Sequence, residues 1–159
     1  MAYEDRTYHG IHGVGGDENE NEWRPARLLV EKPEDGPTQR QNVTVLRELK
    51  AKDEDELGGY GWGYNGGGTS RTAAAVLADA LDLGTPEKAG LSMSEWPQDD
   101  TLVALREDFC IDFLSQFCDE WRLGRAAVLR WARGWYLQRG VTDLPEALHS
   151  LPPLVDIEV

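Results

Sequence analysis

The chain is poor in cysteine and lysine. Its 159 residues include two cysteines, Cys110 and Cys118, and four lysines against 12 arginines. Both cysteines fall in one expected helical stretch, where eight residues of helix separate them by roughly 12 Å, too far for a disulfide. We interpret both as buried thiols. A chain of this length can bury a hydrophobic core without a metal or disulfides, so we expect residues 1–159 to form a single domain.

Membrane and export signals are also missing. The sequence has no run of about 18 apolar residues that could cross a membrane. Its amino terminus lacks the basic and then apolar organisation of a secretory signal. The sequence therefore predicts a soluble, cytoplasmic protein without a membrane partner.

No catalytic signature is present. The sequence contains no G-x-x-x-x-G-K-[ST], no serine in a nucleophile elbow, no H-E-x-x-H and no C-x-x-C. His9 and His12 would point to opposite faces of an extended segment, which is poor geometry for one metal ion. We therefore expect no catalytic residues, no metal site and no cofactor.

Acidic residues dominate the charge. The formal net charge is −13, from 29 acidic and 16 basic residues. Such an excess keeps a protein soluble, and it fits adaptation to concentrated salt (a halophilic source) or mimicry of nucleic-acid charge. A chain this acidic is a poor DNA binder unless its basic groups are segregated.

A partial segregation of basic groups occurs near the carboxyl end. Between residues 122 and 139 the sequence has five arginines and no acid. Such a basic patch could bind phosphate or pair with the protein's own carboxylates. The residues that we assign to the patch are Arg122, Arg125, Arg130 and Arg133.

The amino-terminal half is typical of short strands joined by polar loops. The candidate strands are Arg6–Gly10, Arg27–Glu31 and Asn42–Leu46, because these segments are rich in β-forming residues. Acidic and glycine-rich stretches near 13–22 and 50–57 predict exposed loops.

Helical periodicity dominates the carboxyl-terminal half. We expect helices from Thr69 or Ser70 to about Leu83, over Thr101–Trp121, and over Arg125–Gln138, with Gly124 breaking the second from the third. Residues 84–99 are expected to form an irregular connection. The second helix should carry a solvated row of polar residues, namely Asp108, Asp112, Ser115 and Asp119.

The fold expectation is α+β. We predict a small, mainly antiparallel sheet from the amino-terminal half, packed by about three helices. A short helical turn follows Thr142, and residues 151–159 end in an alternating segment that predicts an edge strand or docking arm.

The segment from residue 59 to residue 72 has the least ordinary composition. Glycine and aromatic residues alternate over 59–64, which predicts a strand with one aromatic face and with Trp62 in the core. Three glycines then open a helix that Thr69 or Ser70 could cap. Free N–H groups at such a start could hold an anion, aided by Arg71, although the segment could equally be a tight packing corner. The candidate ligand-binding residues are Tyr60, Trp62, Tyr64, Gly66, Gly67, Gly68, Thr69, Ser70 and Arg71.

Several motifs of the chain occur together in one known family. The order of Arg6–Gly10, two further strands and then Gly61–Thr69 before an alanine-rich helix resembles a family of small uncharacterised bacterial, archaeal and phage domains. The hallmark of that family is Trp-Gly-Tyr-Gly-Gly-Ser-Gly-Pro before a helix. A later helix ending in tryptophan has its counterpart here in Asp108-Phe109 and Trp121–Leu123. The resemblance covers most of residues 6–136 and implies an architecture but no activity. The chain departs from the hallmark at Asn65, Thr69 and Ser70.

Three functions follow as hypotheses. The first is a non-enzymatic binding or interaction protein of a virus or mobile element, whose acidic surface binds a host protein or mimics nucleic acid. The alternative is a binder of a phosphorylated small ligand or nucleotide at the glycine-rich loop, residues 63–71. A second alternative is DNA binding, because the helices on either side of Gly124 resemble a helix-turn-helix whose second helix is rich in arginine.

Overall fold

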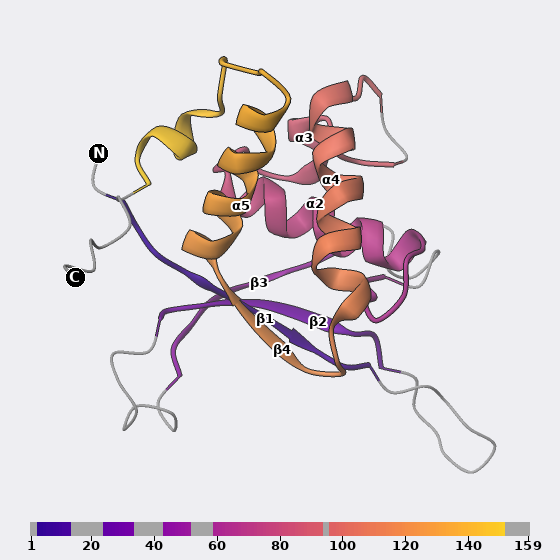
Figure 1. The fold of residues 1–159 in the computed structure, drawn as a ribbon. Helices are drawn as coiled ribbons and strands as arrows, with labels where there is room; N and C mark the ends of the chain where they lie inside the picture. Colours follow the sequence, from indigo (N-terminus) through magenta and orange to yellow (C-terminus); the bar gives the residue numbers. More distant parts are fainter. Residues whose placement is uncertain (1–2, 14–23, 34–42, 52–58, 94–95, 152–159) are drawn as a thin grey trace, which may run out of the picture.

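The structure is an α+β arrangement in which the helices lie on one face of a four-stranded sheet (Figure 1). It is a computed structural model and describes residues 3–13, 24–33, 43–51, 59–93 and 96–151. The predicted fold class is therefore confirmed. In chain order the described elements are β1 (Thr7–Ile11), β2 (Arg27–Glu31), β3 (Val45–Leu49), α2 (Gly67–Ala80), α3 (Pro86–Ala89), α4 (Asp100–Asp112), η1 (Leu114–Gln116), β4 (Trp121–Gly124), α5 (Arg125–Gln138) and η2 (Glu146–His149).

The sheet has the strand order β3-β2-β1-β4, and every neighbouring pair is antiparallel. The predicted bounds of β2 are confirmed, whereas β1 begins one residue later than expected and β3 three residues later. Alternation along the strands separates two faces. Tyr8, Leu28 and Val30 are fully buried beneath the helices, whereas His9 and Glu31 belong to the opposite face.

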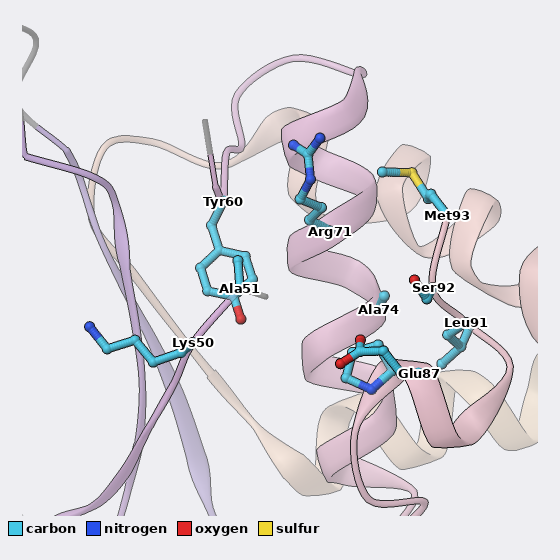
Figure 2. A pocket seen from close by; sticks show the side chains of 10 residues that line it. Lys50, Ala51, Tyr60, Arg71, Ala74, Glu87, Leu91, Ser92 and Met93 are labelled. Atoms are coloured by element: carbon cyan, nitrogen blue, oxygen red, sulfur yellow. The ribbon is translucent and has the colours of Figure 1, made fainter. Parts of the chain in front are cut away.

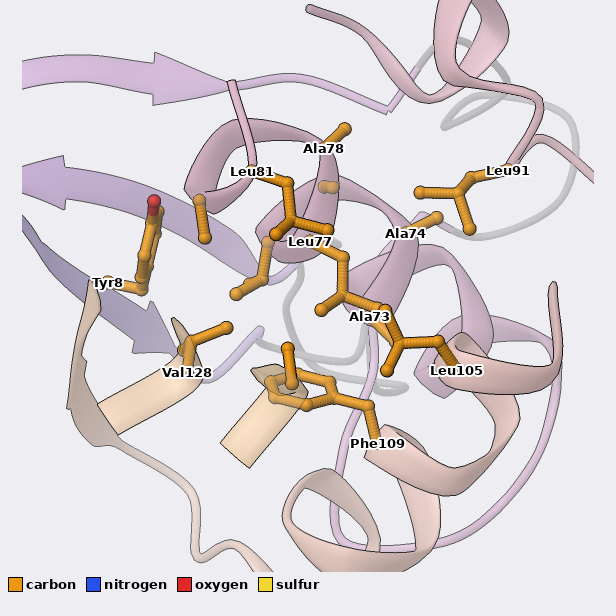
Figure 3. Packing of buried hydrophobic residues seen from close by; sticks show 14 of the residues in the cluster. Tyr8, Ala73, Ala74, Leu77, Ala78, Leu81, Leu91, Leu105, Phe109 and Val128 are labelled. Atoms are coloured by element: carbon orange, nitrogen blue, oxygen red, sulfur yellow. The ribbon is translucent and has the colours of Figure 1, made fainter. Parts of the chain in front are cut away.

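Helix α2 is the centre of the core. Ten of its 14 residues are buried, half of them alanine, and small side chains let neighbouring elements approach closely. Figure 3 shows Leu77 of α2 packed among Tyr8 of β1, Phe109 of α4 and Val128 of α5. The core therefore lies between the sheet and the helices, with α2 inside.

The predicted helix over Thr101–Trp121 is wrong in its second half. Helix α4 ends at Asp112, the short η1 follows, and the chain then becomes extended and pairs with β1 as strand β4. The free edge of β1 offers unpaired backbone groups to residues 121–124, which a continued helix would leave unused. Trp121 lies opposite Gly10, where any Cβ would collide with the indole ring. Gly124 thus ends a strand, and one strand of the sheet comes from the carboxyl-terminal half.

Two smaller differences concern helices. The short α3 lies inside the predicted irregular connection, and the Thr85 side chain accepts a bond from the Lys88 N–H at its start. Helix α2 spans Gly67–Ala80 and therefore begins and ends about three residues earlier than predicted. The predicted bounds of α5 are confirmed.

Some predictions lie outside the described residues. They are most of the acidic loops, at 14–22 and 52–57, and the carboxyl-terminal arm at 152–159. Within the described part of the chain, no helix has the length and apolarity needed to cross a membrane.

Candidate functional site

Residues 59–64 form a folded corner instead of the predicted strand. Gly59 and Gly63 have φ angles of 74° and 84°, which turn the chain out of an extended path. The Gly61 N–H donates to the Gly68 carbonyl at 3.0 Å and lies 3.1 Å from the Thr72 hydroxyl. The segment therefore folds back on the first turns of α2 and does not join the sheet.

The three aromatic residues of this corner do not share a face. Tyr60 and Trp62 are buried, which confirms Trp62 as a core residue. Tyr64, by contrast, is 53% exposed. Trp62 meets Trp121 edge to face with 5.4 Å between ring centroids. Tyr64 instead lies over the loop, because a Cβ on Gly68 would be 2.6 Å from its hydroxyl. Packing against Tyr64 therefore explains Gly61 and Gly68, where an added Cβ would lie within 2.6 Å of its hydroxyl.

The start of α2 differs from the prediction. Gly66 occupies the N-cap position and no side chain caps the helix. The Thr69 hydroxyl donates to the Tyr64 carbonyl at 2.6 Å. The Ser70 side chain is hydrogen-bonded to the thiol of Cys110. Because the helix begins at Gly67, Thr69 and Ser70 fall inside its first turn and are buried. Neither hydroxyl is available to an anion, contrary to expectation.

Arg71 gives this end of α2 a positive character. Its guanidinium donates to the Gly59 carbonyl at 3.1 Å, and a Cβ on Gly67 would lie 3.8 Å from both terminal nitrogens. The first turn of α2 contains no acidic residue. The guanidinium and the positive end of the helix dipole therefore add, and an anion nearby would be stabilised.

A pocket opens beside α2 and brings Arg71 together with residues of three other segments (Figure 2). We call it the α2 pocket; its empty volume, including open solvent at the mouth, is about 470 Å³. Ala74 and Leu91 are buried in its floor, and Tyr60, also buried, forms one wall. The full lining is Lys50, Ala51, Tyr60, Arg71, Ala74, Pro86, Glu87, Leu91, Ser92 and Met93.

Only two of the predicted ligand-binding residues, Tyr60 and Arg71, line the α2 pocket. Sequence reasoning missed Lys50, Glu87 and Ser92, because they come from segments that only the fold brings together. Lys50 lies in the strand-to-loop region after β3, and its ammonium is 3.1 Å from Glu48 in an exposed ion pair. The scarcity of lysine, with four in the sequence, was the one feature of the sequence that could have drawn attention to Lys50.

The predicted basic patch does not form one surface. Arg125 is buried and donates to the Ala80 carbonyl and to Asp82, both at 2.9 Å. Arg122 donates to Glu31 at 3.0 Å. Arg130 is half-buried and Arg133 is exposed. Two of the four arginines therefore hold the protein's own elements together, which is one of the two outcomes that the sequence left open.

The four polar residues that were predicted to form a solvated row on one helix do not share a helix face. Helix α4 ends before Ser115 and Asp119, so these two residues leave its face. The other two bind α5, since Asp108 accepts from the Trp135 indole at 2.7 Å and Asp112 accepts from the Trp131 indole at 2.9 Å. These carboxylates join α4 to α5.

A charge cluster surrounds His9, in which the side chains of His9 and Glu31 are buried and those of Glu120 and Arg122 are exposed. The two ring nitrogens of His9 lie 2.5 Å from Glu31 and 2.5 Å from Glu120, and Arg122 also contacts Glu31. The Arg122 guanidinium also lies 3.3 Å from Nδ1 of His9, the ring nitrogen that faces Glu31. The cluster therefore joins side chains from β1, β2 and the start of β4. Among the described residues no group of three or more metal-ligating side chains is found.

A second network joins β1 to the end of α2. The Asp79 carboxylate accepts from Arg6 at 2.6 Å, from the Tyr8 hydroxyl at 2.7 Å and from Arg47 at 2.9 Å. Burial, together with the negative charge of Asp79, raises the pKa of Tyr8 above its ordinary value. The phenol therefore stays protonated and acts as a structural donor.

A family comparison covers this architecture. A family model matches residues 30–134, from β2 into α5. The chain belongs to the family of unknown function DUF6166. The match includes the glycine-rich residues 59–68, which we call the glycine corner, and the α2 pocket, and it confirms the resemblance to an uncharacterised domain. No curated protein and no solved structure matches the chain.

Proposed function

We propose that this protein is a non-enzymatic binding protein and that its α2 pocket takes a small anionic ligand with a flat apolar part. The observation that carries the proposal is the position of Arg71 near the start of α2, beside a pocket lined by the buried side chains of Tyr60, Ala74 and Leu91. In a chain with a net charge of −13, a pocket lined by two cationic side chains and one acid is a local exception. An anion steered to this place would meet complementary charge.

The lining chemistry favours binding over turnover. None of the ten lining residues is a histidine or a cysteine. The guanidinium of Arg71 keeps its charge at any physiological pH, and it can form a planar, two-pronged contact with phosphate or carboxylate. Tyr60, Ala74 and Leu91 supply an apolar surface for a ring. A phosphorylated small molecule or nucleotide satisfies both requirements, with the binding place moved from the loop to the flank of α2.

Calorimetric titrations with inorganic phosphate, phenyl phosphate and AMP test the proposal. We expect the two ligands with a ring to bind more tightly than phosphate alone, because they also bury apolar area. Arg71→Gln should weaken binding about tenfold or more, as expected for the loss of a charge-assisted bond.

Arg133→Gln is the matched control, since it removes the same charge from an exposed position on α5. If both arginine variants lower the affinity equally, general electrostatics accounts for the binding and the proposal is wrong. Lack of binding by all three ligands would also contradict it.

A protein partner is the second candidate function, favoured by an exposed tryptophan. Trp96 is 78% exposed and Met93 is 38% exposed. Asp99 and Asp100 follow Trp96 and are exposed, and the sequence between Lys88 and Arg106 contains no basic residue. A basic partner segment could pair with these acids and place an arginine over the indole. This surface is where the predicted acidic interaction with a host protein has most support.

A labelled arginine-rich peptide tests the second candidate. Trp96→Ala should weaken its binding several-fold, whereas Leu137→Ala, at another exposed apolar position, should not. Equal effects would mean that the peptide responds only to net charge. Viral origin and nucleic-acid mimicry stay predictions, and DNA binding has less support because Arg122 and Arg125 are engaged in ion pairs within the molecule.

A further inference from the structure

We infer that the ligand of the α2 pocket carries an N–H donor at the end opposite its anionic group. The inference rests on the proposed function and deepens it. Arg71 and Glu87 both line the pocket but belong to different elements, α2 and α3. Figure 2 shows them toward opposite ends of the pocket, with Ala74 of α2 between them. The pocket therefore has a positive end and a negative end.

The negative end is an available acceptor. Glu87 is half-buried at the start of α3. In the described part of the chain no hydrogen bond or ion pair engages its carboxylate, although it lines the pocket. An ionised carboxylate accepts hydrogen bonds and donates none. A ligand group placed against it is stabilised if it is an N–H and repelled if it is an acceptor or an anion.

The positive end fixes the direction of the ligand. The guanidinium of Arg71 lies along the first turn of α2, where the helix dipole is also positive. Lys50 lines the pocket from the β3 side, away from Arg71 in Figure 2, and its ammonium is paired with Glu48 at 3.1 Å. The anionic group of a ligand therefore lies toward Arg71, and the rest of the ligand extends along the pocket toward Glu87.

The middle of the pocket selects a flat, apolar group. Tyr60 is 8% exposed and presents its ring on one wall, with Met93 on the other side in Figure 2. Ala74 leaves room above the helix, and Leu91 closes the floor. The ligand class is thus a flat ring with an anionic group at one edge and an amino group at the other. Nucleotides with an amino-bearing base and amino-substituted aromatic acids share this chemistry.

Two matched ligand pairs test the inference by calorimetry. AMP and purine riboside 5′-monophosphate differ only in the 6-amino group, which the second ligand lacks. 4-Aminobenzoate and 4-methylbenzoate have nearly the same shape, but only the first has an N–H. In at least one pair we expect the amino member to bind about tenfold more tightly, which is the effect of one hydrogen bond to a charged acceptor. The pair that shows the preference identifies the source.

The Glu87→Met variant decides whether Glu87 is responsible. It should reduce the amino preference to within about twofold, because the acceptor is lost while the pocket stays filled. The control Glu146→Met removes the same charge from an exposed position in η2 and should leave the preference unchanged. A change in folding alone would affect both members of a pair equally, so the ratio of affinities is insensitive to it.

The outcomes separate the two proposals. If the ligands bind in an Arg71-dependent manner but neither pair shows an amino preference, the further inference is wrong and the proposed function stands. A preference that persists in Glu87→Met also overturns the inference. If no ligand binds at all, both fail.

Discussion

The two cysteines show how one residue type takes two roles. Cys110 is fully buried on α4, and burial raises the pKa of its thiol to about 11. Cys118 lies beyond the end of α4 and is exposed, so the prediction that both thiols are buried is wrong for Cys118. The error follows from the helix boundary, because a continued helix would have kept residue 118 against the core.

We expect the two thiols to react at very different rates. At about pH 8 a thiol reagent should modify Cys118 within seconds to minutes, and Cys110 only when the protein unfolds, because the thiolate is the reactive form. Counting the modified thiols with and without denaturant checks this expectation. The variant Cys118→Ser should show almost no reaction in the folded state, and rapid labelling of that variant would contradict the assignment.

At the scale of elements, the glycine corner depends on glycine at some positions and not at others. A Cβ on Gly68 would lie 2.6 Å from the Tyr64 hydroxyl and 3.2 Å from the backbone nitrogen of Gly61. A Cβ on Gly67 would meet only the Arg71 guanidinium, at an ordinary 3.8 Å. Packing therefore requires glycine at position 68 but not at the neighbouring position 67.

Alanine at these two positions should have opposite effects on stability. We expect Gly68→Ala to lower the free energy of unfolding by about 1–3 kcal/mol, because Tyr64 and the backbone must move. Gly67→Ala should be neutral or stabilising by up to about 1 kcal/mol, since alanine restricts the unfolded chain more than glycine does. Urea unfolding measures both. Equal losses would show that the corner does not pack as described.

The pair of strands β2 and β3 carries a pH-dependent contact. Arg27 donates to Glu48 at 2.9 Å, and this bond lowers the pKa of the Glu48 carboxyl. A lowered pKa means that the contact stabilises the folded state above the ordinary pKa of glutamate and loses this effect as the pH falls through the folded-state value.

Glu48→Gln should therefore cost more stability near pH 7 than in acid. The expected loss near neutrality is about 0.5 kcal/mol, because the pair is partly exposed. Urea unfolding of both proteins at several pH values measures the difference. A loss that stays constant as the pH falls would contradict the assigned ion pair.

At the scale of the whole molecule, Arg125 joins three parts of the chain that are distant in sequence. It donates to the carbonyl of Glu4 before β1, to the carbonyl of Ala80 at the end of α2, and to the Asp82 carboxylate. A cation at the end of a helix also meets the negative end of its dipole. The start of α5 is thereby fixed to both layers of the fold.

Replacing this arginine should destabilise the whole protein. We expect Arg125→Met to lower the free energy of unfolding by about 3 kcal/mol, because several buried acceptors lose their donors. Arg133→Met, at an exposed position of the same helix, should change it by less than about 0.5 kcal/mol. Thermal and urea unfolding compare the two. A small effect of Arg125→Met would mean that water replaces its hydrogen bonds.

Local pattern and composition determined much of the fold. The bounds of β2 and α5 followed from β-forming composition and from helical periodicity between glycines, and Trp62 was identified as a core residue. The α+β class and the importance of the glycine segment followed in the same way. These features depend on interactions between residues close in sequence, which a single sequence displays directly.

Contacts between segments that are distant in sequence decided the remaining features of the structure. The aromatic spacing through Trp121 is helical, yet the open edge of β1 converts residues 121–124 into a strand. The alternation over 59–64 is that of a strand, yet the Gly61 N–H finds its acceptor in α2. The α2 pocket likewise unites Lys50, Arg71 and Glu87 from three segments that are distant in sequence. Backbone groups pair with whatever acceptor the fold brings near, so pairing partners and site composition depend on contacts that no local pattern records.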